Sequence, residues 1–221
     1  MTFKGYEILR LGKPLARNVV TQLFGDDNAC ILKDGTGNII SVNQTTGLCD
    51  TGYTSVYKYS GLKGHNGTDF GANTGTPIFA CTDGTVCEIE TEPSRGLGIG
   101  IVTDEKMHWM FKDDAIYYAK TRYWHLKTIG VSMGQKVKKG QIIGEADNTG
   151  WSTGSHLHLE LKPVLYDKNG KMYNVFQDNG YFGAKNPINF MEDFKGQDLL
   201  DLQARIRGAI YWFLKKLANK I

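Results

Sequence analysis

Residues 154–161 read GSHLHLEL, and this short run decides much of what the chain can be. Successive side chains of a β-strand point to opposite faces, so His156, His158 and Glu160 share one face and the leucines share the other. Imidazoles two residues apart on one face lie about 6.5–7 Å from each other. That distance is too long for contact, but it suits one histidine that binds a metal and another that handles a proton. The run therefore predicts a strand with one apolar face and one chemically active face.

A second polar run lies upstream, where residues 64–71 read GHNGTDFG. It offers the imidazole of His65 and the carboxylate of Asp69, four residues apart. Together with one histidine of the downstream pair, these side chains would form three ligands with a fourth position open to water, as in catalytic zinc sites. Such a zinc ion acidifies water and polarises a carbonyl, which suits amide hydrolysis. The spacing alone leaves a second reading open, namely that these are unrelated surface histidines.

The first 190 residues are typical of antiparallel β structure. Asp34-Gly35, Asp83-Gly84 and Asn169-Gly170 each lie between runs rich in Val, Ile, Tyr and Phe, and such dipeptides favour tight hairpin turns. No helical stripe precedes Pro187. We expect a mainly β domain with short connections. The expected strands cover residues 77–81, 85–90, 98–103, 115–125 and 156–163.

Length and charge narrow the class of protein. A chain of 221 residues with 41% hydrophobic and 22% charged residues predicts one globular domain, or one domain with an appendage. Residues 195–221 carry six Lys/Arg and two Asp, which gives this segment a net charge of +4. The whole chain has a net charge of +3, so the net charge of the remaining residues is about −1. The body therefore has no basic excess, and nucleic acid is not an expected partner.

The sequence contains no recognisable targeting signal. Its longest purely apolar run, 209–214, is far too short to span a bilayer. The first 20 residues lack the apolar core of a signal peptide. We therefore expect a soluble protein without a visible targeting segment.

The four cysteines are spaced 19, 32 and 6 residues apart and form no CxxC pair, so a structural zinc knuckle is not expected. Cys81 and Cys87 flank the Asp83-Gly84 turn and could be cross-strand neighbours. Because nothing indicates an oxidising compartment, we expect free buried thiols.

The segment after about Gln197 has a different pattern and predicts one amphipathic helix reaching Ile221. Its apolar stripe follows helical spacing and consists of Leu199, Leu202, Ile206, Ile210, Phe213, Leu217 and Ile221. We divide the chain into a domain of residues 1–194 and this helical segment, 195–221. Three docking surfaces stay open for the stripe: the chain's own β domain, a partner protein or second copy, and, as the least favoured, a membrane surface.

Longer motifs now identify a family resemblance. HNGTDFG, TPIFACTDGTV, YWHL and VKKGQIIGEADNTGWSTGSHLHLELKP occur in this order between about Val19 and Phe190. The combination resembles the lysostaphin-like zinc metallopeptidases, the LytM-type peptidoglycan endopeptidases. The resemblance implies a mainly β fold, an antiparallel β-sheet groove, and one Zn²⁺ per chain.

The resemblance also implies roles for individual residues. It makes His65, Asp69 and His158 the zinc ligands. His156, the first histidine of the HLH pair, and His125 in YWHL would be the catalytic histidines, acting on the attacking water and the tetrahedral intermediate.

A tyrosine near the zinc is a feature of some members of that family. Tyr59 stands six positions before the first ligand and is assigned a stabilising role, with Tyr53 and Tyr57 as close competitors. The alternative is that the aromatic ring belongs to the core.

The chain departs from the family pattern at two places. Within GEADN, residues 144–148, an Asp stands where a glycine is commoner. Between Phe24-Gly25 and His65 lies an inserted loop or hairpin, about 26–58, which we expect to form a groove-side loop that affects substrate choice.

The resemblance predicts a zinc-dependent hydrolase that acts on the bacterial cell wall and cleaves a peptide bond in the stem or cross-bridge of peptidoglycan. The lack of a visible signal peptide favours a second hypothesis, a bacteriophage tail component carried in the virion, with the 197–221 helix as a contact to a virion protein. A third hypothesis is a wall-binding module without catalysis; the complete ligand set argues against it.

Overall fold

The computed structural model describes residues 2–27, 29–36, 38–44, 49, 52–109 and 115–192. The helix predicted for residues 197–221, and with it the segment 195–221, lies outside the described residues. Within the described ranges, no helix is long and apolar enough to cross a membrane.

The described part of the chain is mainly β, as predicted. One sheet contains the strands β3 (Val20–Gln22), β7 (Thr68–Gly71), β8 (Pro77–Phe79), β9 (Gly84–Glu92), β10 (Gly96–Val102), β11 (Met107–His108), β12 (Ile116–Ile129), β13 (Lys136–Val137), β14 (Ile142–Ala146), β15 (His156–Tyr166) and β16 (Met172–Asn174). A second sheet contains β4 (Ala29–Lys33), β5 (Ile39–Gln44) and β6 (Thr54–Ser55). The remaining elements are β1 (Thr2–Phe3), β2 (Tyr6–Glu7), the one-turn helix α1 (Val56–Tyr59) and the 3₁₀ turn η1 (Pro187–Phe190).

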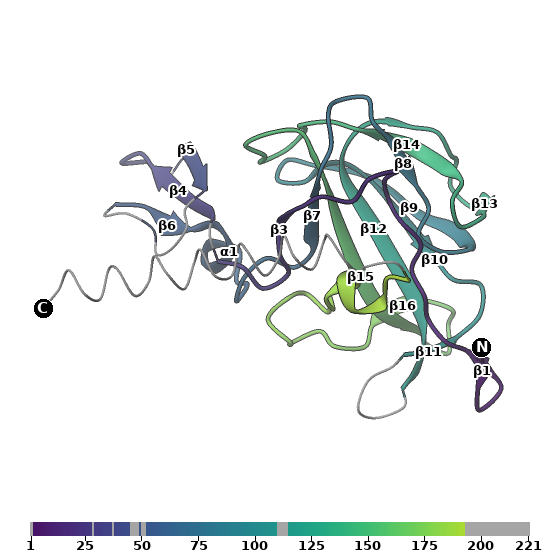
Figure 1. Cartoon of the computed structure of the whole chain (residues 1–221). Coiled ribbons are helices and arrows are strands. Elements are labelled where there is room, and N and C mark those ends of the chain that lie inside the picture. The colour runs from purple at the N-terminus through teal and green to yellow at the C-terminus, as the bar shows by residue number, and fades with distance from the viewer. Residues whose placement is uncertain are drawn as a thin grey trace, which may run out of the picture.

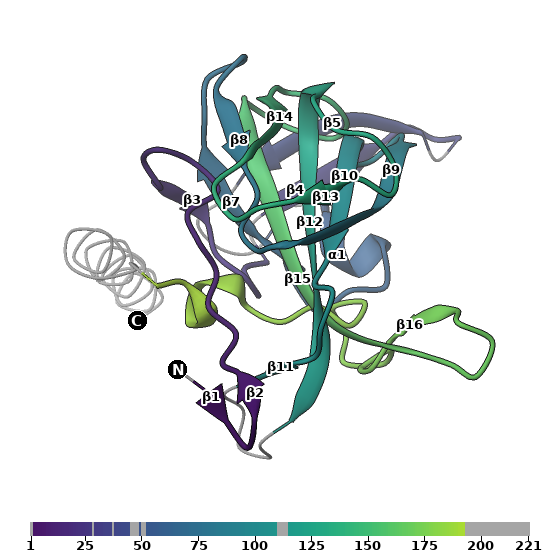
Figure 2. The same cartoon turned by 90° about the vertical axis from the view of Figure 1, so that its right-hand side faces the viewer.

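The main path of the large sheet runs β13-β9-β10-β12-β15-β7-β3. Every pairing within it is antiparallel. The two longest strands, β12 and β15, lie side by side in its middle (Figure 2). The motif-bearing strand β15 is thus held on both sides, by β12 and by β7. A strand in this position cannot shift its register without breaking two ladders.

The hairpin signals were correct at two of three places. Asp34-Gly35 lies between the paired strands β4 and β5, and Asn169-Gly170 lies between the paired strands β15 and β16. Asp83-Gly84 does not close a hairpin, because β8 pairs with β14 whereas β9 pairs with β10 and β13. The Asp-Gly dipeptide indicates only a local turn, whereas the strand before it, β8, pairs with the distant strand β14.

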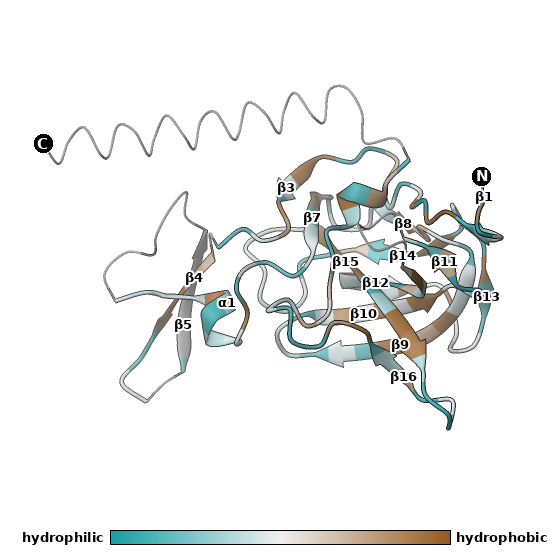
Figure 3. Ribbon diagram, turned by 90° about the horizontal axis from the view of Figure 1, so that it is seen from below, coloured by the Kyte–Doolittle hydropathy of each residue, from teal (hydrophilic) through white to brown (hydrophobic). Residues whose placement is uncertain are grey.

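The hydrophobic core contains the apolar face of β15 and buried residues of the neighbouring strands β12 and β7. Leu157, Leu159 and Leu161 are fully buried, together with Tyr123 of β12 and Phe70 of β7. The predicted burial of the leucines on one face of β15 is therefore correct. Figure 3 shows hydrophobic and hydrophilic residues mixed along the strands of the large sheet. On the opposite face of β15, His158, Glu160 and Lys162 are buried as well, and Arg122 of β12 lies 3.3 Å from Glu160.

The predicted insertion forms a separate small unit. β4, β5 and β6 pair around β4, and α1 packs beside them through a small core of Ala29, Tyr57 and Leu62. The unit stands to one side of the large sheet, next to its β3–β7 edge (Figure 1).

A disulfide bond joins Cys30 and Cys49 of this unit. The expectation of free thiols was therefore wrong for this pair. Cys81 and Cys87 are free thiols, as expected, but only Cys81 is buried, whereas Cys87 is partly exposed.

The packing of the large sheet requires a glycine in β10. Gly98 of β10 lies against Trp124 of β12, and a Cβ added at Gly98 would overlap the indole ring. We predict that Gly98→Ala lowers the free energy of unfolding by about 1–3 kcal/mol, the usual cost of overpacking. Urea unfolding measures this, with Gly35→Ala as the control, because a Cβ at Gly35 meets nothing within 4 Å. Equal stability of the two variants would contradict the packing of β10 on β12.

Candidate metal centre and its cleft

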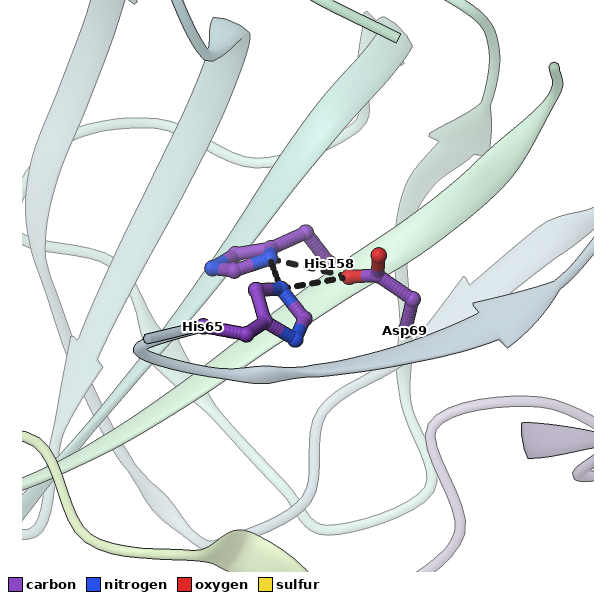
Figure 4. A group of neighbouring side chains, drawn as sticks. All are labelled: His65, Asp69 and His158. Atoms are coloured by element: carbon purple, nitrogen blue, oxygen red, sulfur yellow. Dashed lines mark hydrogen bonds and ion pairs between the residues drawn. The ribbon is translucent and has the colours of Figure 1, made fainter. Parts of the chain in front are cut away.

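The predicted ligands converge at the pairing of β7 with β15. Asp69 of β7 lies directly opposite His158 of β15 in the ladder, and His65 precedes β7 by a short turn. All three side chains are buried. His65 Nε2 lies 2.8 Å from His158 Nδ1 and 3.1 Å from Asp69 Oδ1, and His158 Nδ1 lies 2.9 Å from Asp69 Oδ1 (Figure 4). The three atoms thus form a nearly regular triangle.

Hydrogen bonds alone do not satisfy this triangle. Each of its three sides would need a proton, and the two imidazole nitrogens supply at most two. Burial raises the pKa of Asp69, but the imidazoles of His65 and His158 hold that pKa well below its usual value, so the carboxylate supplies none. A cation bound to all three atoms removes the conflict. Zinc–ligand bonds of about 2.0–2.1 Å in a tetrahedron place neighbouring ligand atoms about 3.3 Å apart, close to the observed distances. The donor set, two nitrogens and one carboxylate oxygen, fits zinc.

The ring orientation of His65 is set by the backbone. Its Nδ1–H donates to the carbonyl oxygen of Leu23 at 3.1 Å, which leaves the lone pair of Nε2 for a metal. Carbonyl partners of this kind fix the tautomer of metal-binding histidines.

A buried carboxylate stands behind His158. Glu160 Oε1 lies 3.6 Å from His158 Nε2 and accepts a hydrogen bond of 2.9 Å from Asn66 Nδ2. Its other oxygen lies 3.0 Å from Lys162 Nζ and 3.3 Å from Arg122 Nη1. Burial raises the pKa of Glu160, whereas Lys162, His158 and Arg122 lower it to well below its usual value. The ionised carboxylate therefore favours a proton on His158 Nε2, which leaves Nδ1 as the nitrogen that can bind a metal.

His125 is held in an unusual backbone conformation. Its φ of 63° lies in the left-handed region, next to a register shift in β12. Non-glycine residues in this region carry strain that is often found at functional sites. The backbone N–H of His125 donates to the carbonyl of Arg95 at 3.1 Å, and Nδ1–H donates to the carbonyl of Thr149 at 2.5 Å.

The imidazole of His125 is neutral. Burial, and next the nearby His156, lower its pKa to about 3. With the proton on Nδ1, its Nε2 carries a free lone pair at neutral pH.

His156 completes the group. Its Nδ1–H faces the carbonyl of Gly154 at 2.7 Å, and its Nε2 lies 3.4 Å from Asp69 Oδ2. The ring centroids of His125 and His156 are 4.5 Å apart. The structure thus brings both predicted catalytic histidines beside the predicted ligands.

A cleft opens above these five side chains. The insertion contributes Ala29, Val56 and Tyr57 to the lining, and Ser60 and Leu62 follow it in the chain. Other parts of the lining come from Ser94, Arg95, Trp151 and Phe182. Residues of the segment 26–58 thus contribute to the lining of this cleft.

The structure does not bring Tyr59 to this group. Tyr59 is 49% exposed, lies outside the cleft lining, and has the ammonium of Lys33 3.5 Å above its ring. Tyr57, two residues earlier in α1, points the other way: it is buried, its ring centroid lies 5.7 Å from that of His65, and its hydroxyl accepts a hydrogen bond from Gln22 Nε2. Burial, then Asp69, raise the pKa of Tyr57, which keeps the phenol protonated.

Some contributors were not predicted from the sequence. The carbonyls of Leu23 and Thr149 carry no side-chain signal. Arg122 lies opposite Glu160 in the β12–β15 ladder, so only knowledge of that pairing could have indicated it.

Comparison with known proteins gives a consistent picture. The model of "Peptidase family M23" matches residues 63–175. Glycyl-glycine endopeptidase ALE-1 of Staphylococcus capitis is 34% identical over 129 residues, which is 58% of this chain and 29% of that protein. Peptidoglycan DD-endopeptidase ShyA of Vibrio cholerae is 42% identical over 143 residues, 64% of this chain and 29% of that protein. The matches thus span about three tenths of each relative.

Two solved structures are also similar. The catalytic domain of lysostaphin from Staphylococcus simulans has a TM-score of 0.44 and 29% identity, covering 58% of this chain and 79% of that one. A zinc-containing peptidase from Vibrio cholerae has a TM-score of 0.47 and 28% identity, covering 71% of this chain and 37% of that one.

We predict that the purified protein binds about one zinc per chain, and that His65→Ala, Asp69→Ala and His158→Ala each remove most of it, because each deletes one of three ligands.

Zinc affinity should also fall as the pH falls. In the metal-free chain, Asp69 and Glu160 outweigh burial and raise the pKa of His158 to about 9, so binding at neutral pH displaces a proton and weakens about tenfold per pH unit below that pKa. Elemental analysis and competition with a chromophoric chelator measure both effects.

Glu160→Gln provides a graded comparison for these ligand variants. It keeps the side chain's size and removes the charge behind His158, so zinc affinity should fall about 10–100-fold without being abolished. Full zinc content in His158→Ala would show that the ligand set is wrong.

Proposed function

The chain belongs to peptidase family M23, and we propose that it is a zinc-dependent endopeptidase that hydrolyses a peptide bond of bacterial peptidoglycan. The observation that carries this proposal is the triangle of His65, Asp69 and His158 with His125 and His156 beside it. When bound, zinc supplies Lewis acidity towards a carbonyl oxygen and acidifies water. The protein's own side chains supply the proton transfers and the positioning.

His125 and His156 are proposed as the proton-transfer groups. Each donates its Nδ1–H to a backbone carbonyl, of Thr149 and Gly154 respectively, and this fixes the ring and leaves Nε2 as an acceptor. An acceptor at this place can take a proton from the attacking water and return it to the leaving amine. In the neutral state of His125 the lone pair of Nε2 is free at neutral pH.

Tyr57 takes the supporting role that the sequence assigned to Tyr59. Because its hydroxyl oxygen accepts a hydrogen bond from Gln22, the phenol's own proton is left for another acceptor. We propose that this proton stabilises the negative charge that develops on the substrate carbonyl.

The substrate proposal rests on the family and on the named relatives, one a glycyl-glycine endopeptidase and one a peptidoglycan DD-endopeptidase. Both act on peptide bonds, so we propose the peptide part of the wall, stem or cross-bridge, as the substrate class. Mass spectrometry of the fragments released from purified walls identifies the bond.

Carriage in a phage particle is kept as a proposal about context. It is compatible with the hydrolase, and detection of the protein in purified particles decides it. The binding-only hypothesis predicts retention on purified walls with no released peptide, which zymography distinguishes from hydrolysis.

We predict that His125→Ala and His156→Ala keep zinc and lose about 10²–10⁴-fold in turnover, the usual contribution of a positioned acid or base. Tyr59→Phe is the matched control on the exposed side of α1 and should keep normal activity, whereas Tyr57→Phe should lower it. Release of soluble peptide from purified wall measures the rates. Near-normal turnover of zinc-loaded His125→Ala would contradict its role.

Residues 195–221 are proposed to be separate from the hydrolase. All five side chains of the site lie before residue 159, so truncation after Phe194 should leave hydrolysis largely intact. A folded, zinc-loaded truncation that cleaved no soluble peptide would contradict this division of the chain.

A further inference from the structure

Phe182 combines two features that do not favour folding. Its φ of 50° lies in the left-handed region, which favours glycine and asparagine, and its side chain is 41% exposed. The residue lies in the turn between β16 and η1, where an asparagine or glycine would avoid the strain and the exposed ring. The side chain lines the cleft that holds the metal centre.

The turn that presents Phe182 is firmly anchored. Asn179 Oδ1 accepts hydrogen bonds from the backbone N–H groups of Tyr181 and Gly183, at 2.9 and 3.0 Å, and Asn179 Nδ2 donates to the carbonyl of Ala184 at 2.9 Å. The ring of Tyr181 packs on Phe24, with centroids 4.7 Å apart. These contacts impose the backbone conformation of residue 182 from both sides. The strained residue is thus held in place by its surroundings rather than by its own preference.

We propose that Phe182 is a substrate-contacting residue, whose ring packs against an apolar C–H face of the wall polymer. This inference rests on the proposed function, because it concerns the same cleft. Trp151, 37% exposed, gives the lining a second accessible aromatic side chain. An aromatic face accepts either the methyl group of an alanine in the peptide or the C–H face of a sugar ring. The exposed ring is in contact with water in the free protein, and covering it with substrate removes that apolar surface from water and so contributes to the free energy of binding.

The direct test is Phe182→Gly in the full chain with zinc bound. Glycine removes the ring and also relieves the strain, so function and stability should change in opposite directions. We expect KM for soluble wall fragments to rise about tenfold with kcat nearly unchanged, because the ring contributes to binding and not to proton transfer. The melting temperature should stay equal or rise by about 2–4 °C.

Two further variants serve as controls. Lys4, in the turn between β1 and β2 and outside the cleft lining, has a φ of 49°, so Lys4→Gly gives the same backbone relief without touching the cleft. It should leave KM unchanged. Phe182→Tyr keeps the aromatic face and should restore the wild-type KM.

Binding is measured separately from hydrolysis, by calorimetry in the His125→Ala background, with two probes. These are the free stem peptide and the same peptide attached to its disaccharide. A loss of about tenfold with both probes assigns the contact to the peptide, and a loss with the disaccharide probe alone assigns it to the sugar.

The outcomes separate this inference from the proposed function. Weakened binding in His125→Ala/Phe182→Gly supports the contact even where the wild-type protein cleaves nothing, in which case the hydrolase proposal alone fails. The contact is overturned by unchanged affinity, by absence of binding of both probes to His125→Ala, or by a melting temperature of Phe182→Gly that falls by several degrees, since that fall identifies a structural anchor.

Discussion

The antiparallel register of β7 and β15 is the constraint on which the rest of the structure depends. It places Asp69 directly opposite His158, and the turn before β7 adds His65 to the same point. A slip of one residue would turn His158 towards the core and a leucine towards the cleft, because side chains alternate along a strand. The buried leucines of β15 resist such a slip. The hydrophobic core therefore fixes the ligand geometry.

The polar face of β15 carries the second layer of this arrangement. Burying Glu160 would be costly without partners, and Arg122 and Lys162 supply the compensating charges. Arg122 in turn pairs with Glu88 and Glu90 of β9, so the network extends across three strands of the sheet. Such a network restrains the carboxylate behind His158. The same strand thus contributes packing on one face and oriented charge on the other.

Alternation in residues 156–161 was enough to predict the strand, its apolar face and the shared face of the two histidines. Local sequence patterns could not predict the features that depend on contacts between distant segments of the chain. The Cys30–Cys49 bond joins segments whose proximity follows only from the insertion's own fold. The spacing from His65 favoured Tyr59, but the one-turn helix α1 places Tyr57 in the cleft and Tyr59 in solvent. The positive φ of His125 could not be predicted either, because a histidine does not indicate a left-handed backbone conformation in the way that a glycine does.

The central claim is that the metal held by this triangle drives hydrolysis of a peptide bond, and one measurement tests it most directly. The protein is stripped of metal with a chelator, incubated with purified peptidoglycan before and after addition of one equivalent of zinc, and the released fragments are analysed by mass spectrometry. The account predicts no release by the stripped protein and, after zinc, fragments cut within the peptide with an intact glycan. Release that is insensitive to stripping, or fragments cut within the glycan, would contradict it.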